Sequence, residues 1–445
     1  MSLVFWLAHF ARRNLKIGLG YVALAVFWIS FEYFHYHWEI QWPWLTLGNG
    51  FANNIKLIQW YETTGVFGGS LWILCVNIFL TQFITNFKNT PVKKGALLIS
   101  LFKIATFVFV PVLYSYYIYL HYTEKGEPVN IVLVQPNVNP YFENFTQEAE
   151  NEKVINFIEL AKTEITNETN FILGSETVVE SYLNWDENHL SENMQFNMFK
   201  NFLCDYPNVE LVFGASTSKT YSDESFATKT AREKDGKIYD VFNSAIFMNN
   251  TGATQIYHKS VLVSGVEKVP FANYFDFLKK LHFDFGGASG NIGNKNELPV
   301  FTARNGTKIA PVICFESVFG EYVADNMKNG AELIFILTND GWWKNTPGYK
   351  QHLLFARLRA IETRRGIARA SNTGVSCLIS PQGDFLKTTK WDEESAVSGT
   401  TYSNSEITFY AKSGDYIARV ALFTSILLLL FLLVEQLKIY KKKPH

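Results

Sequence analysis

The stretch Lys308-Ile-Ala-Pro-Val-Ile-Cys-Phe-Glu-Ser-Val-Phe-Gly-Glu321 decides the fold of the middle of this chain. Apolar residues fill most positions from 309 to 313, which is the short continuous pattern of a β-strand buried on both faces. Ser317 is placed to cap a helix that runs to about Lys328. Cys314 then lies at a strand-to-helix corner, where helix amides and the positive end of the helix dipole favour a thiolate. The alternative is a buried cysteine that packs as a small hydrophobe.

The composition predicts a membrane protein. Charged residues make up only 18% of the 445 residues, which is low for a soluble protein, and the hydrophobic residues, 48% of the chain, are concentrated at both ends. The net charge of -1 comes without a basic stripe, which argues against a nucleic-acid partner. The four cysteines lie far apart with no Cys-x-x-Cys spacing, so neither a disulfide framework nor a zinc site is predicted.

Four stretches are apolar and long enough to cross a bilayer, namely residues 17–36, 64–83, 97–120 and 417–434. Residues 1–10 are apolar but only about half as long as a spanning helix needs to be, so they are interpreted as the tail of a longer segment. They also lack the basic start and the small-residue cleavage site of a signal peptide.

Basic residues beside these stretches predict the orientation of the chain. They are Arg12, Arg13 and Lys16 before the first stretch, Lys88, Lys93 and Lys94 after the second, and Lys438 to Lys443 at the end. The positive-inside rule places all of them on the cytoplasmic side, and the segment between the third and fourth spans on the opposite side. The predicted organisation is a membrane-helical region at 1–123 with three full spans and a partial one, a domain at 124–415, and a C-terminal span with a basic tail at 416–445.

The domain at 124–415 has the alternating strands and helices of an α/β fold. The predicted strands are residues 129–135, 170–174, 209–215, 309–313, 333–338 and 373–380, the predicted helices are 147–165 and 349–365, and a hairpin joins 244–248 to 254–257. Three reactive residues, Glu176, Lys259 and Cys314, each follow one of these strands directly.

These three side chains are expected to converge, because the ligand crevice of an open α/β sheet forms outside the carboxyl ends of its strands. A carboxylate can act as general base for a thiol, and a lysine beside both can stabilise a thiolate or an oxyanion. Each residue alone is weak evidence, since a lone Glu after a strand is usually solvated or capping and a lone Lys is usually surface charge.

An ordered set of motifs adds a family resemblance. The motifs are Val134-Gln-Pro-Asn137, Gly174-Ser-Glu-Thr177, Tyr257-His-Lys259, Val266-Glu-Lys-Val-Pro270, Ile313-Cys-Phe-Glu316, Asn339-Asp-Gly-Trp-Trp343, Arg359-Ala-Ile-Glu362 and Ala370-Ser-Asn-Thr-Gly374, with Trp42-Pro-Trp-Leu-Thr-Leu-Gly48 near the N-terminus. Together they resemble the apolipoprotein N-acyltransferases, membrane enzymes of bacterial lipoprotein maturation whose catalytic part belongs to the nitrilase, or carbon-nitrogen hydrolase, superfamily.

The resemblance implies a nitrilase-like αββα sandwich domain inserted between transmembrane helices. It implies Glu176 as base, Lys259 as charge stabiliser and Cys314 as nucleophile, with Glu267 and Glu316 as supporting active-site carboxylates. It implies no metal and no organic cofactor. The other motif residues are interpreted as structural, with roles in loop and helix packing: Trp342, Trp343, His352, Arg359 and Glu362.

The resemblance also implies the reaction and its place. An acyl chain passes from a phospholipid to a thioester on Cys314, and then to the α-amine of the N-terminal diacylglyceryl-cysteine of a lipoprotein. The enzyme is expected to be multi-pass in the bacterial inner membrane, with its catalytic domain on the periplasmic side. Two other functions stay open, a membrane-anchored amidase and an inactive relative that binds lipids or lipoproteins.

The chain departs from the family pattern in four places, one of which is Lys344, which follows the paired tryptophans where glycine is usual. Phe315 follows the nucleophile where tyrosine is common, and Tyr141, Phe142 and Phe145 compete as the aromatic residue expected after the first strand. The chain also resembles a member that lacks the first N-terminal membrane helices.

Overall fold

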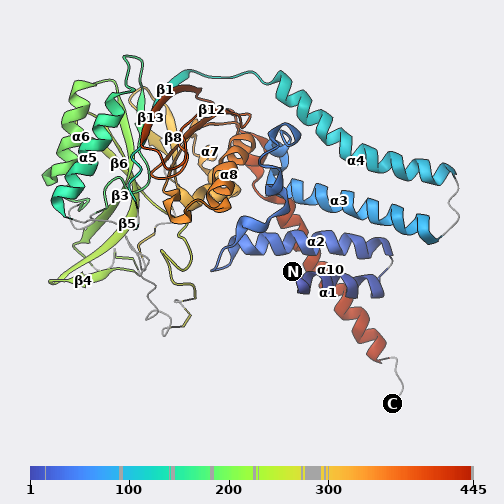
Figure 1. Ribbon diagram of the computed structural model, residues 1–445. Helices are drawn as coiled ribbons and strands as arrows, with labels where there is room; N and C mark the ends of the chain where they lie inside the picture. Colours follow the sequence, from blue (N-terminus) through green and yellow to red (C-terminus); the bar gives the residue numbers. More distant parts are fainter. Residues whose placement is uncertain are drawn as a thin grey trace. The chain divides into compact units, whose positions relative to one another are not determined.

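The computed structural model describes residues 1–445 except 16, 90–93, 140, 142–145, 181–184, 224–226, 229, 272–273, 276–291, 295–296, 299 and 442–445. The chain divides into two compact units (Figure 1). A helical unit contains residues 1–122 and 408–445, and an α/β unit contains residues 123–407. Of the basic residues used above for orientation, Lys16, Lys93, Lys442 and Lys443 lie outside the described residues.

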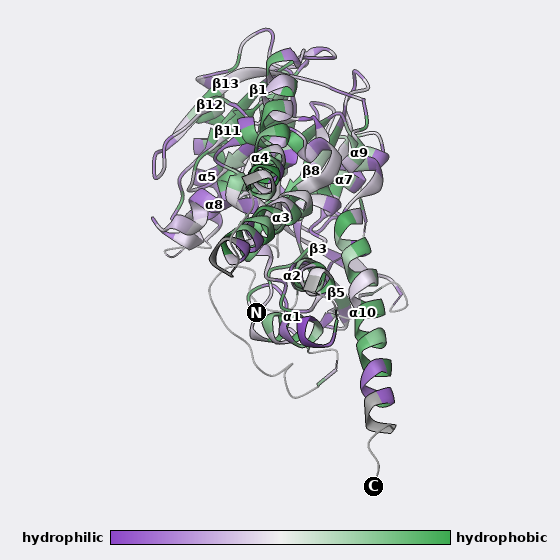
Figure 2. Cartoon of the chain, turned by 90° about the vertical axis from the view of Figure 1, so that its right-hand side faces the viewer, coloured by the Kyte–Doolittle hydropathy of each residue, from purple (hydrophilic) through white to green (hydrophobic). Residues whose placement is uncertain are grey.

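The helical unit contains three helices that are long and apolar enough to cross a membrane, among the residues that the structure describes. They are the segments Tyr61–Asn86 of α3, Gly95–His121 of α4 and Tyr416–Lys438 of α10, and α10 is green along most of its length in Figure 2. The predicted first span forms α2, which is not one of the three segments found among the described residues. The helices of this unit are α1 (Ser2–Asn14), α2 (Ile17–His37), α3 (Tyr61–Asn89), α4 (Lys94–His121), α9 (Phe409–Ser413) and α10 (Tyr416–Lys441).

The helical unit resumes at Thr408, earlier than the predicted position 416, because the short helix α9 packs within it. Tyr410 is fully buried, and its hydroxyl donates to Asp415 Oδ1 at 2.7 Å. Its ring lies against Gly65, which kinks α3 with a φ of +61°. A side chain at position 65 would collide with the ring and would be strained by the positive φ, so this close approach requires glycine.

Two mixed β-sheets face each other in the α/β unit. The seven-stranded sheet has the order β13-β1-β2-β3-β5-β4, with β6 paired to β5, and the six-stranded sheet has the order β12-β11-β10-β9-β8-β7. The strands of the first are β1 (Pro128–Gln135), β2 (Phe171–Leu173), β3 (Glu210–Tyr221), β4 (Arg232–Lys234), β5 (Lys237–Met248), β6 (Thr254–His258) and β13 (Ser395–Tyr402). Those of the second are β7 (Phe301–Thr302), β8 (Lys308–Ile313), β9 (Leu333–Thr338), β10 (Gly366–Ser371), β11 (Cys377–Ile379) and β12 (Phe385–Thr388).

Both faces of the central strands are buried, which explains their continuous apolar sequences. Ile131 and Leu133 of β1 point into the core between the two sheets, while Val132 and Val134 point to the opposite face. Helices α5 (Gln147–Lys162) and α6 (Met194–Asp205) cover that face, and α7 (Gly320–Lys328) and α8 (Pro347–Thr363) contact β8, β10 and β11 (Figure 1). The predicted αββα sandwich is therefore confirmed.

Three local predictions are wrong. Residues Cys314–Val318 form a 3-10 turn, and α7 begins only at Gly320 with Phe319 at its N-cap, so Ser317 does not cap it. Helix α8 ends at Thr363 because Arg364 adopts a left-handed conformation. The chain then enters β10, a strand that the sequence pattern did not predict, and the expected strand at 373–380 is reduced to β11.

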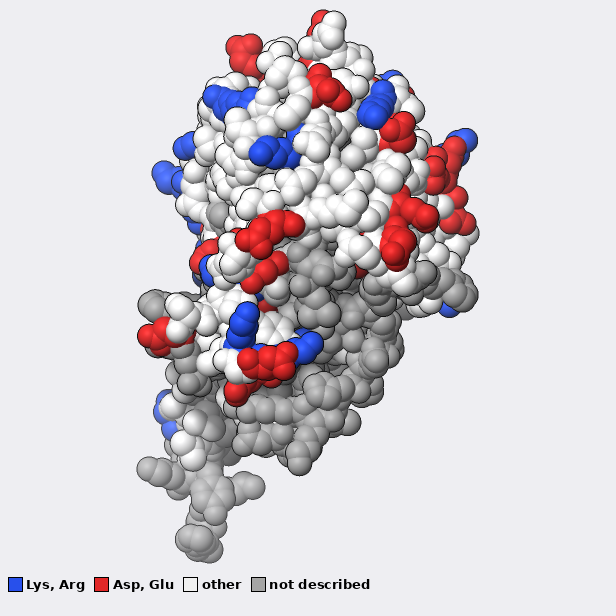
Figure 3. All heavy atoms as spheres, turned by 90° about the vertical axis from the view of Figure 1, so that its left-hand side faces the viewer, with Lys and Arg blue, Asp and Glu red and all other residues white. Residues whose placement is uncertain are grey.

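Figure 3 shows one charged face of the molecule. Lys and Arg side chains are interspersed with Asp and Glu over the described part of this face. The described part of this face therefore shows no basic patch of the kind that nucleic acid requires.

Candidate active site

Cys314 lies at the end of β8, in the left-handed region of backbone conformation with a φ of +49°. This conformation is strained for a residue other than glycine and persists only where neighbouring contacts enforce it. The Cys314 carbonyl accepts hydrogen bonds from Ser317 Oγ at 2.7 Å and from His352 Nε2 at 3.2 Å. On the other side of the corner, Glu316 Oε2 accepts from the Ile313 amide at 2.7 Å. The corner is thus held rigidly with the thiol at the carboxyl end of the strand.

Lys259 follows β6 and lies between two carboxylates. Its Nζ donates to Glu176 Oε1 at 3.1 Å and to Glu267 Oε1 at 2.8 Å, and the side chain is only 1% exposed. Burial opposes the charge on the lysine, but the carboxylates of Glu176 and Glu267 outweigh it and raise the Lys259 pKa well above its usual value. The site therefore contains a fixed ammonium group that remains charged across the physiological pH range.

Glu176 follows β2 and is oriented by three donors. Oε1 accepts from Lys259 Nζ and from Asn243 Nδ2 at 2.8 Å, and Oε2 accepts from the Asn339 amide at 3.1 Å. These donors come from three separate segments of the chain, so the carboxylate is fixed by tertiary packing.

Asn243 is the site residue that sequence reasoning missed. Its Nδ2 donates to Glu176 Oε1 and, at 3.3 Å, to Glu267 Oε1, and its carbonyl accepts from the Lys259 amide at 2.8 Å. A polar residue inside the apolar stretch 241–248 was the available signal, because a buried amide needs hydrogen-bond partners. Asn243 therefore holds the carboxylates of Glu176 and Glu267 in position beside Lys259.

The thiol of Cys314 interacts electrostatically with both charged groups. Loss of solvation raises the Cys314 pKa, and the nearby Glu176 carboxylate raises it further, while Lys259 and a hydrogen bond from Thr338 act in the opposite direction. The net shift is well above the usual thiol range. The expectation that the corner favours a thiolate is therefore wrong for the resting protein, because desolvation and a neighbouring negative charge outweigh the helix amides. The nucleophile is a neutral thiol that needs a base when it reacts.

We expect Glu176→Gln to move the pH midpoint of iodoacetamide alkylation of Cys314 downward, and Lys259→Met to move it upward. Removing a neighbouring negative charge makes the thiolate less unfavourable, and removing the ammonium has the opposite effect. Peptide mass spectrometry across a pH series measures the midpoint, with the exposed Cys204 of the same sample as an internal control for the reagent. Shifts of the opposite sign would contradict these charge assignments.

Glu316 lies behind the nucleophile and ties two loops together. Its Oε1 accepts from the Ser260 amide at 2.6 Å and from the Tyr257 hydroxyl at 2.5 Å, and Oε2 holds the Ile313 amide. The residue is completely buried, and burial raises its pKa despite these donors. Glu316 thereby joins the segment that carries Lys259 to the corner that carries Cys314.

The remaining motif residues form packing contacts around the site. Asp340 Oδ1 pairs with His352 Nδ1 at 2.9 Å and its Oδ2 pairs with Arg369 Nη2 at 2.7 Å. Arg359 and Glu362 pair with each other at 2.7 Å.

The paired tryptophans are about two-fifths exposed. The Tyr141 hydroxyl donates to the Trp342 carbonyl at 2.9 Å, whereas Phe142 and Phe145 lie outside the described residues. Phe315 packs its ring edge-on against Phe319 at 5.0 Å between ring centroids.

A metal centre is not formed by the residues that the structure describes. No group of three or more His, Cys, Asp or Glu side chains among them is arranged to hold a metal ion. The chemistry available at the described site is that of a thiol, a carboxylate and an ammonium group, which suits acyl transfer through a covalent intermediate.

Comparison with known proteins identifies the family. The carbon-nitrogen hydrolase family matches residues 128–405, and the apolipoprotein N-acyltransferase N-terminal domain matches residues 1–79. Apolipoprotein N-acyltransferase of Chlorobaculum tepidum is 29% identical over 93% of this chain and 77% of the relative. The enzyme of the same name from Geobacter metallireducens is 25% identical over 92% of this chain and 74% of the relative.

A solved structure is similar to a smaller part of the chain. An amidase of the nitrilase superfamily from Nesterenkonia aligns with 66% of this chain and 97% of its own, at 12% identity and a TM-score of 0.44. The family match covers more than half of the chain and coincides with the αββα sandwich described above. The chain therefore belongs to the carbon-nitrogen hydrolase family, as a membrane acyltransferase of the apolipoprotein N-acyltransferase kind.

Proposed function

We propose that this protein transfers an acyl chain from a phospholipid to the α-amine of the N-terminal diacylglyceryl-cysteine of lipoproteins. The observation that carries the proposal is the buried ammonium of Lys259, held between Glu176 and Glu267 and in electrostatic contact with the thiol of Cys314. Two relatives that match most of the chain bear the name apolipoprotein N-acyltransferase. The proposed acceptor is inferred from this name, and the proposed mechanism is inferred from the arrangement of the site.

The first half of the proposed reaction forms a thioester. Glu176 takes the proton of the Cys314 thiol as the sulfur attacks the ester carbonyl of the phospholipid, and the ammonium of Lys259 stabilises the oxyanion that develops. The carbon-oxygen bond of the ester then breaks. The departing alkoxide takes the proton back from Glu176, which leaves a lysophospholipid and an acylated Cys314.

The second half transfers the acyl chain to nitrogen. The α-amine attacks the thioester carbonyl, Glu176 accepts a proton from it, and the same ammonium stabilises the second oxyanion. The carbon-sulfur bond breaks, the thiolate takes the proton from Glu176, and an amide is released. Glu267 and Asn243 position the lysine and the base, and Glu316 positions the corner.

We propose further that the protein is a multi-pass protein of the bacterial inner membrane with its α/β unit on the periplasmic side. Three membrane-capable helices support membrane insertion, and the basic residues that flank the helical segments support this orientation. Both substrates are lipids of that bilayer, which gives a reason for the attachment of the α/β unit to membrane helices.

Acyl transfer and simple hydrolysis make different products from one donor. We expect the purified full chain, given phospholipid with a labelled acyl chain and a diacylglyceryl-cysteine peptide, to place the label on the peptide amine. Thioester chemistry favours an amine acceptor over water only where the acceptor is bound beside the acyl-enzyme. Mass spectrometry of the peptide measures the result, and a peptide with an acetylated α-amine is the matched control. Label recovered only as free fatty acid in both samples would favour a hydrolase instead.

A further inference from the structure

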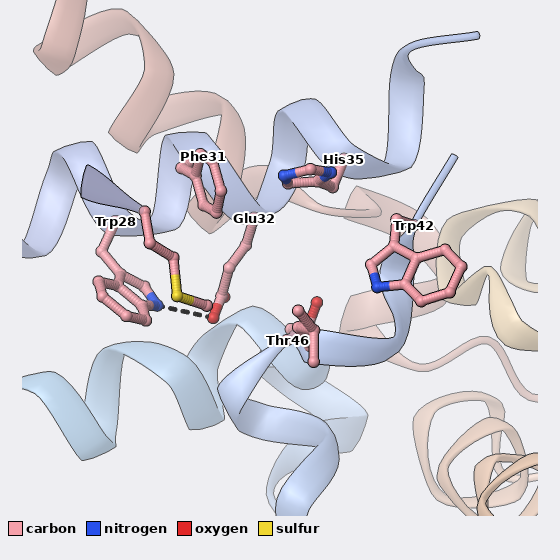
Figure 4. Close-up of a pocket in the computed structure, with 8 residues that line it drawn as sticks. Trp28, Phe31, Glu32, His35, Trp42 and Thr46 are labelled. Carbon is pink, nitrogen blue, oxygen red and sulfur yellow. Dashed lines mark hydrogen bonds between the residues drawn. The ribbon is translucent and has the colours of Figure 1, made fainter. Parts of the chain in front are cut away.

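Buried polar side chains that take no part in the proposed chemistry occur in both units. In the helical unit they line a cavity of about 270 Å³, where Trp28 Nε1 donates to Glu32 Oε1 at 2.9 Å (Figure 4). In the α/β unit they lie beside the backbone of Cys314, in a group that we call the support cluster and that consists of Asp340, His352 and Arg369. The support cluster bears on the reaction, because one of its members contacts the nucleophile's own carbonyl.

The side chains of the support cluster come from separate segments and are fully or almost fully buried. Asp340 follows β9, His352 lies in α8 and Arg369 lies in β10. Asp340 Oδ1 lies 2.9 Å from His352 Nδ1, and Asp340 Oδ2 accepts from Arg369 Nη2 at 2.7 Å. Burial opposes the charge on Asp340, but Arg369 and His352 outweigh it and lower the Asp340 pKa. Asp340 is therefore an ionised carboxylate, which accepts hydrogen bonds and donates none.

The contacts of the His352 ring assign a proton to each of its nitrogens. Nδ1 faces the ionised Asp340, so it donates to that carboxylate. Nε2 lies 3.2 Å from the Cys314 carbonyl oxygen and 3.0 Å from Ser317 Oγ, whose own proton is donated to that carbonyl at 2.7 Å. Both oxygens can accept from Nε2, whereas an unprotonated Nε2 would place its lone pair against that of the carbonyl. His352 is therefore an imidazolium with a full positive charge.

The balance of charge around the active site favours this cation. The buried carboxyl groups of the described site outnumber the lysine and the arginine that compensate them: Glu176, Glu267, Glu316 and Asp340 against Lys259 and Arg369. The carboxylates remain in excess even without Glu316, whose pKa burial raises. A positive charge on His352 reduces this excess, and opposite charges favour the charged form of a titratable group.

Two arginines face the same region and are already engaged. Arg369 Nη2 lies 3.5 Å from His352 Nδ1 and opposes a second charge there, but Asp340 bonds to both cations. Arg359, from α8 itself, donates to a backbone carbonyl at 2.7 Å and pairs with the carboxylate of Glu362. His352 is the member of the support cluster that reaches the Cys314 carbonyl.

We propose that His352 is a positioning residue of the acyl-transfer site, an imidazolium that holds the Cys314 carbonyl and offsets the negative charge of Asp340 as the sulfur becomes a thiolate. The left-handed conformation of Cys314 persists only where contacts enforce it, and His352 supplies one of them. After burial and Glu176, the Asp340 carboxylate also raises the Cys314 pKa, and the imidazolium is bonded to that carboxylate. This role rests on the proposed function, because it concerns the same thiol.

The charge on His352 can be measured without turnover and without replacing the histidine. In the full chain labelled with ¹⁵N at histidine and with ¹³C at the cysteine carbonyls, solid-state NMR identifies the ring nitrogen that is dipole-coupled to the Cys314 carbonyl carbon. Loss of this coupling on specific labelling of the Cys314→Ala variant confirms the assignment. We expect both nitrogens of that ring to carry protons from about pH 6 to about pH 8, across the range in which an ordinary imidazole loses its charge. A ring with one unprotonated nitrogen throughout would overturn the proposal.

Alkylation of Cys314 reports the effect of that charge on the thiol. We expect His352→Gln, which keeps an amide donor but loses the charge, to slow alkylation by iodoacetamide at fixed pH about tenfold, because a neighbouring positive charge favours the reactive thiolate. Asp340→Asn should have the opposite effect, and the double variant should return close to the unmodified rate. His189→Gln, which removes an exposed histidine paired with Asp186, is the matched control and should leave the rate unchanged. Peptide mass spectrometry measures the rates, with the exposed Cys204 as internal standard.

These variants separate the charge of His352 from its packing. A role in packing alone predicts changes of the same sign in the two single variants, which accumulate in the double variant. Opposite changes that cancel in the double variant support the charge, and changes of one sign that accumulate overturn it. If His352→Gln does not fold, Asp340→Asn and the NMR measurement remain as tests.

Single-turnover formation of the acyl-enzyme separates this role from the proposed function. The rate should fall about tenfold in His352→Gln and recover in the double variant, while the phospholipid concentration that gives half the maximal rate stays the same, because His352 acts on the nucleophile and not on substrate binding. An unchanged rate in His352→Gln would reject the role of His352 and leave the proposed function standing. An imidazolium with opposite alkylation changes, in a protein that transfers no acyl chain, would reject the proposed function and leave the role of His352 standing.

Discussion

We expect Cys314→Ala to abolish the labelled acyl-enzyme and the transfer of label to the peptide amine. The substitution removes the atom that forms the thioester, and no neighbouring group replaces it, since Glu176 and Lys259 act on the proton and on the oxyanion. Incubation of membranes with acyl-labelled phospholipid, followed by denaturation and detection of protein-bound label, measures the intermediate. Hydroxylamine, which cleaves thioesters, should release the label from the unmodified protein.

Two further variants make the Cys314 experiment specific. Cys204→Ala removes an exposed cysteine of the same unit and should retain full labelling. Cys314→Ser keeps a nucleophilic oxygen, so any residual label on it should resist hydroxylamine. A labelled, hydroxylamine-sensitive protein in the Cys314→Ala sample would reject the assignment of the nucleophile.

Lys259→Met has the second large expected effect, because it changes catalysis and stability together. The variant loses the ammonium that stabilises the oxyanion, so we expect thioester formation to fall by about 10²- to 10³-fold or more. It also leaves the carboxylates of Glu176 and Glu267 buried without their cation, which typically costs about 3–5 kcal/mol of folding free energy. Single-turnover labelling measures the first effect and thermal denaturation measures the second.

A double variant separates the two effects of Lys259→Met. Adding Glu267→Gln removes one of the two uncompensated carboxylates, so stability should recover in part while acyl-enzyme formation stays lost. Lys387→Met, at an exposed position of β12, is the control for loss of a lysine and should change neither measurement. Normal acyl-enzyme levels in Lys259→Met would remove the lysine from the mechanism.

The positions of the three reactive residues followed from the sequence because strand ends can be recognised locally. A run of buried apolar residues marks a strand, and the first polar residue after it marks the strand's carboxyl end. Glu176 and Cys314 were expected to meet because the ligand crevice of an open sheet lies outside the carboxyl ends of its strands. In the structure the strands that precede them, β2 and β8, belong to two different sheets that face each other. The structure connects Lys259 directly to Glu176 and Glu267, and connects Cys314 to Glu176 and Lys259 electrostatically.

The strands that were missed lack such a local signal. β13 has the sequence Ser-Ala-Val-Ser-Gly-Thr-Thr-Tyr, without a continuous apolar run, and it exists because it pairs antiparallel with β1. Only Arg364, which is left-handed, and Arg365 separate the end of α8 from the start of β10, so the sequence pattern does not distinguish the helix from the strand. The partner of β13 lies more than two hundred residues earlier in the chain, so no window of neighbouring residues contains the information that makes it a strand.

The sequence by itself determined the class of fold, the helical segments at both ends and the residues that follow the strands, because these depend on periodicity and on the order of apolar and polar residues. Only the tertiary structure decided which side chains form hydrogen bonds with each other and whether the active-site thiol is protonated. Asn243 meets Glu176 and Glu316 meets Tyr257 across 67 and 59 residues, and the Cys314 thiol stays protonated. Desolvation and the distance between charges set these properties, and both arise only when distant segments pack together.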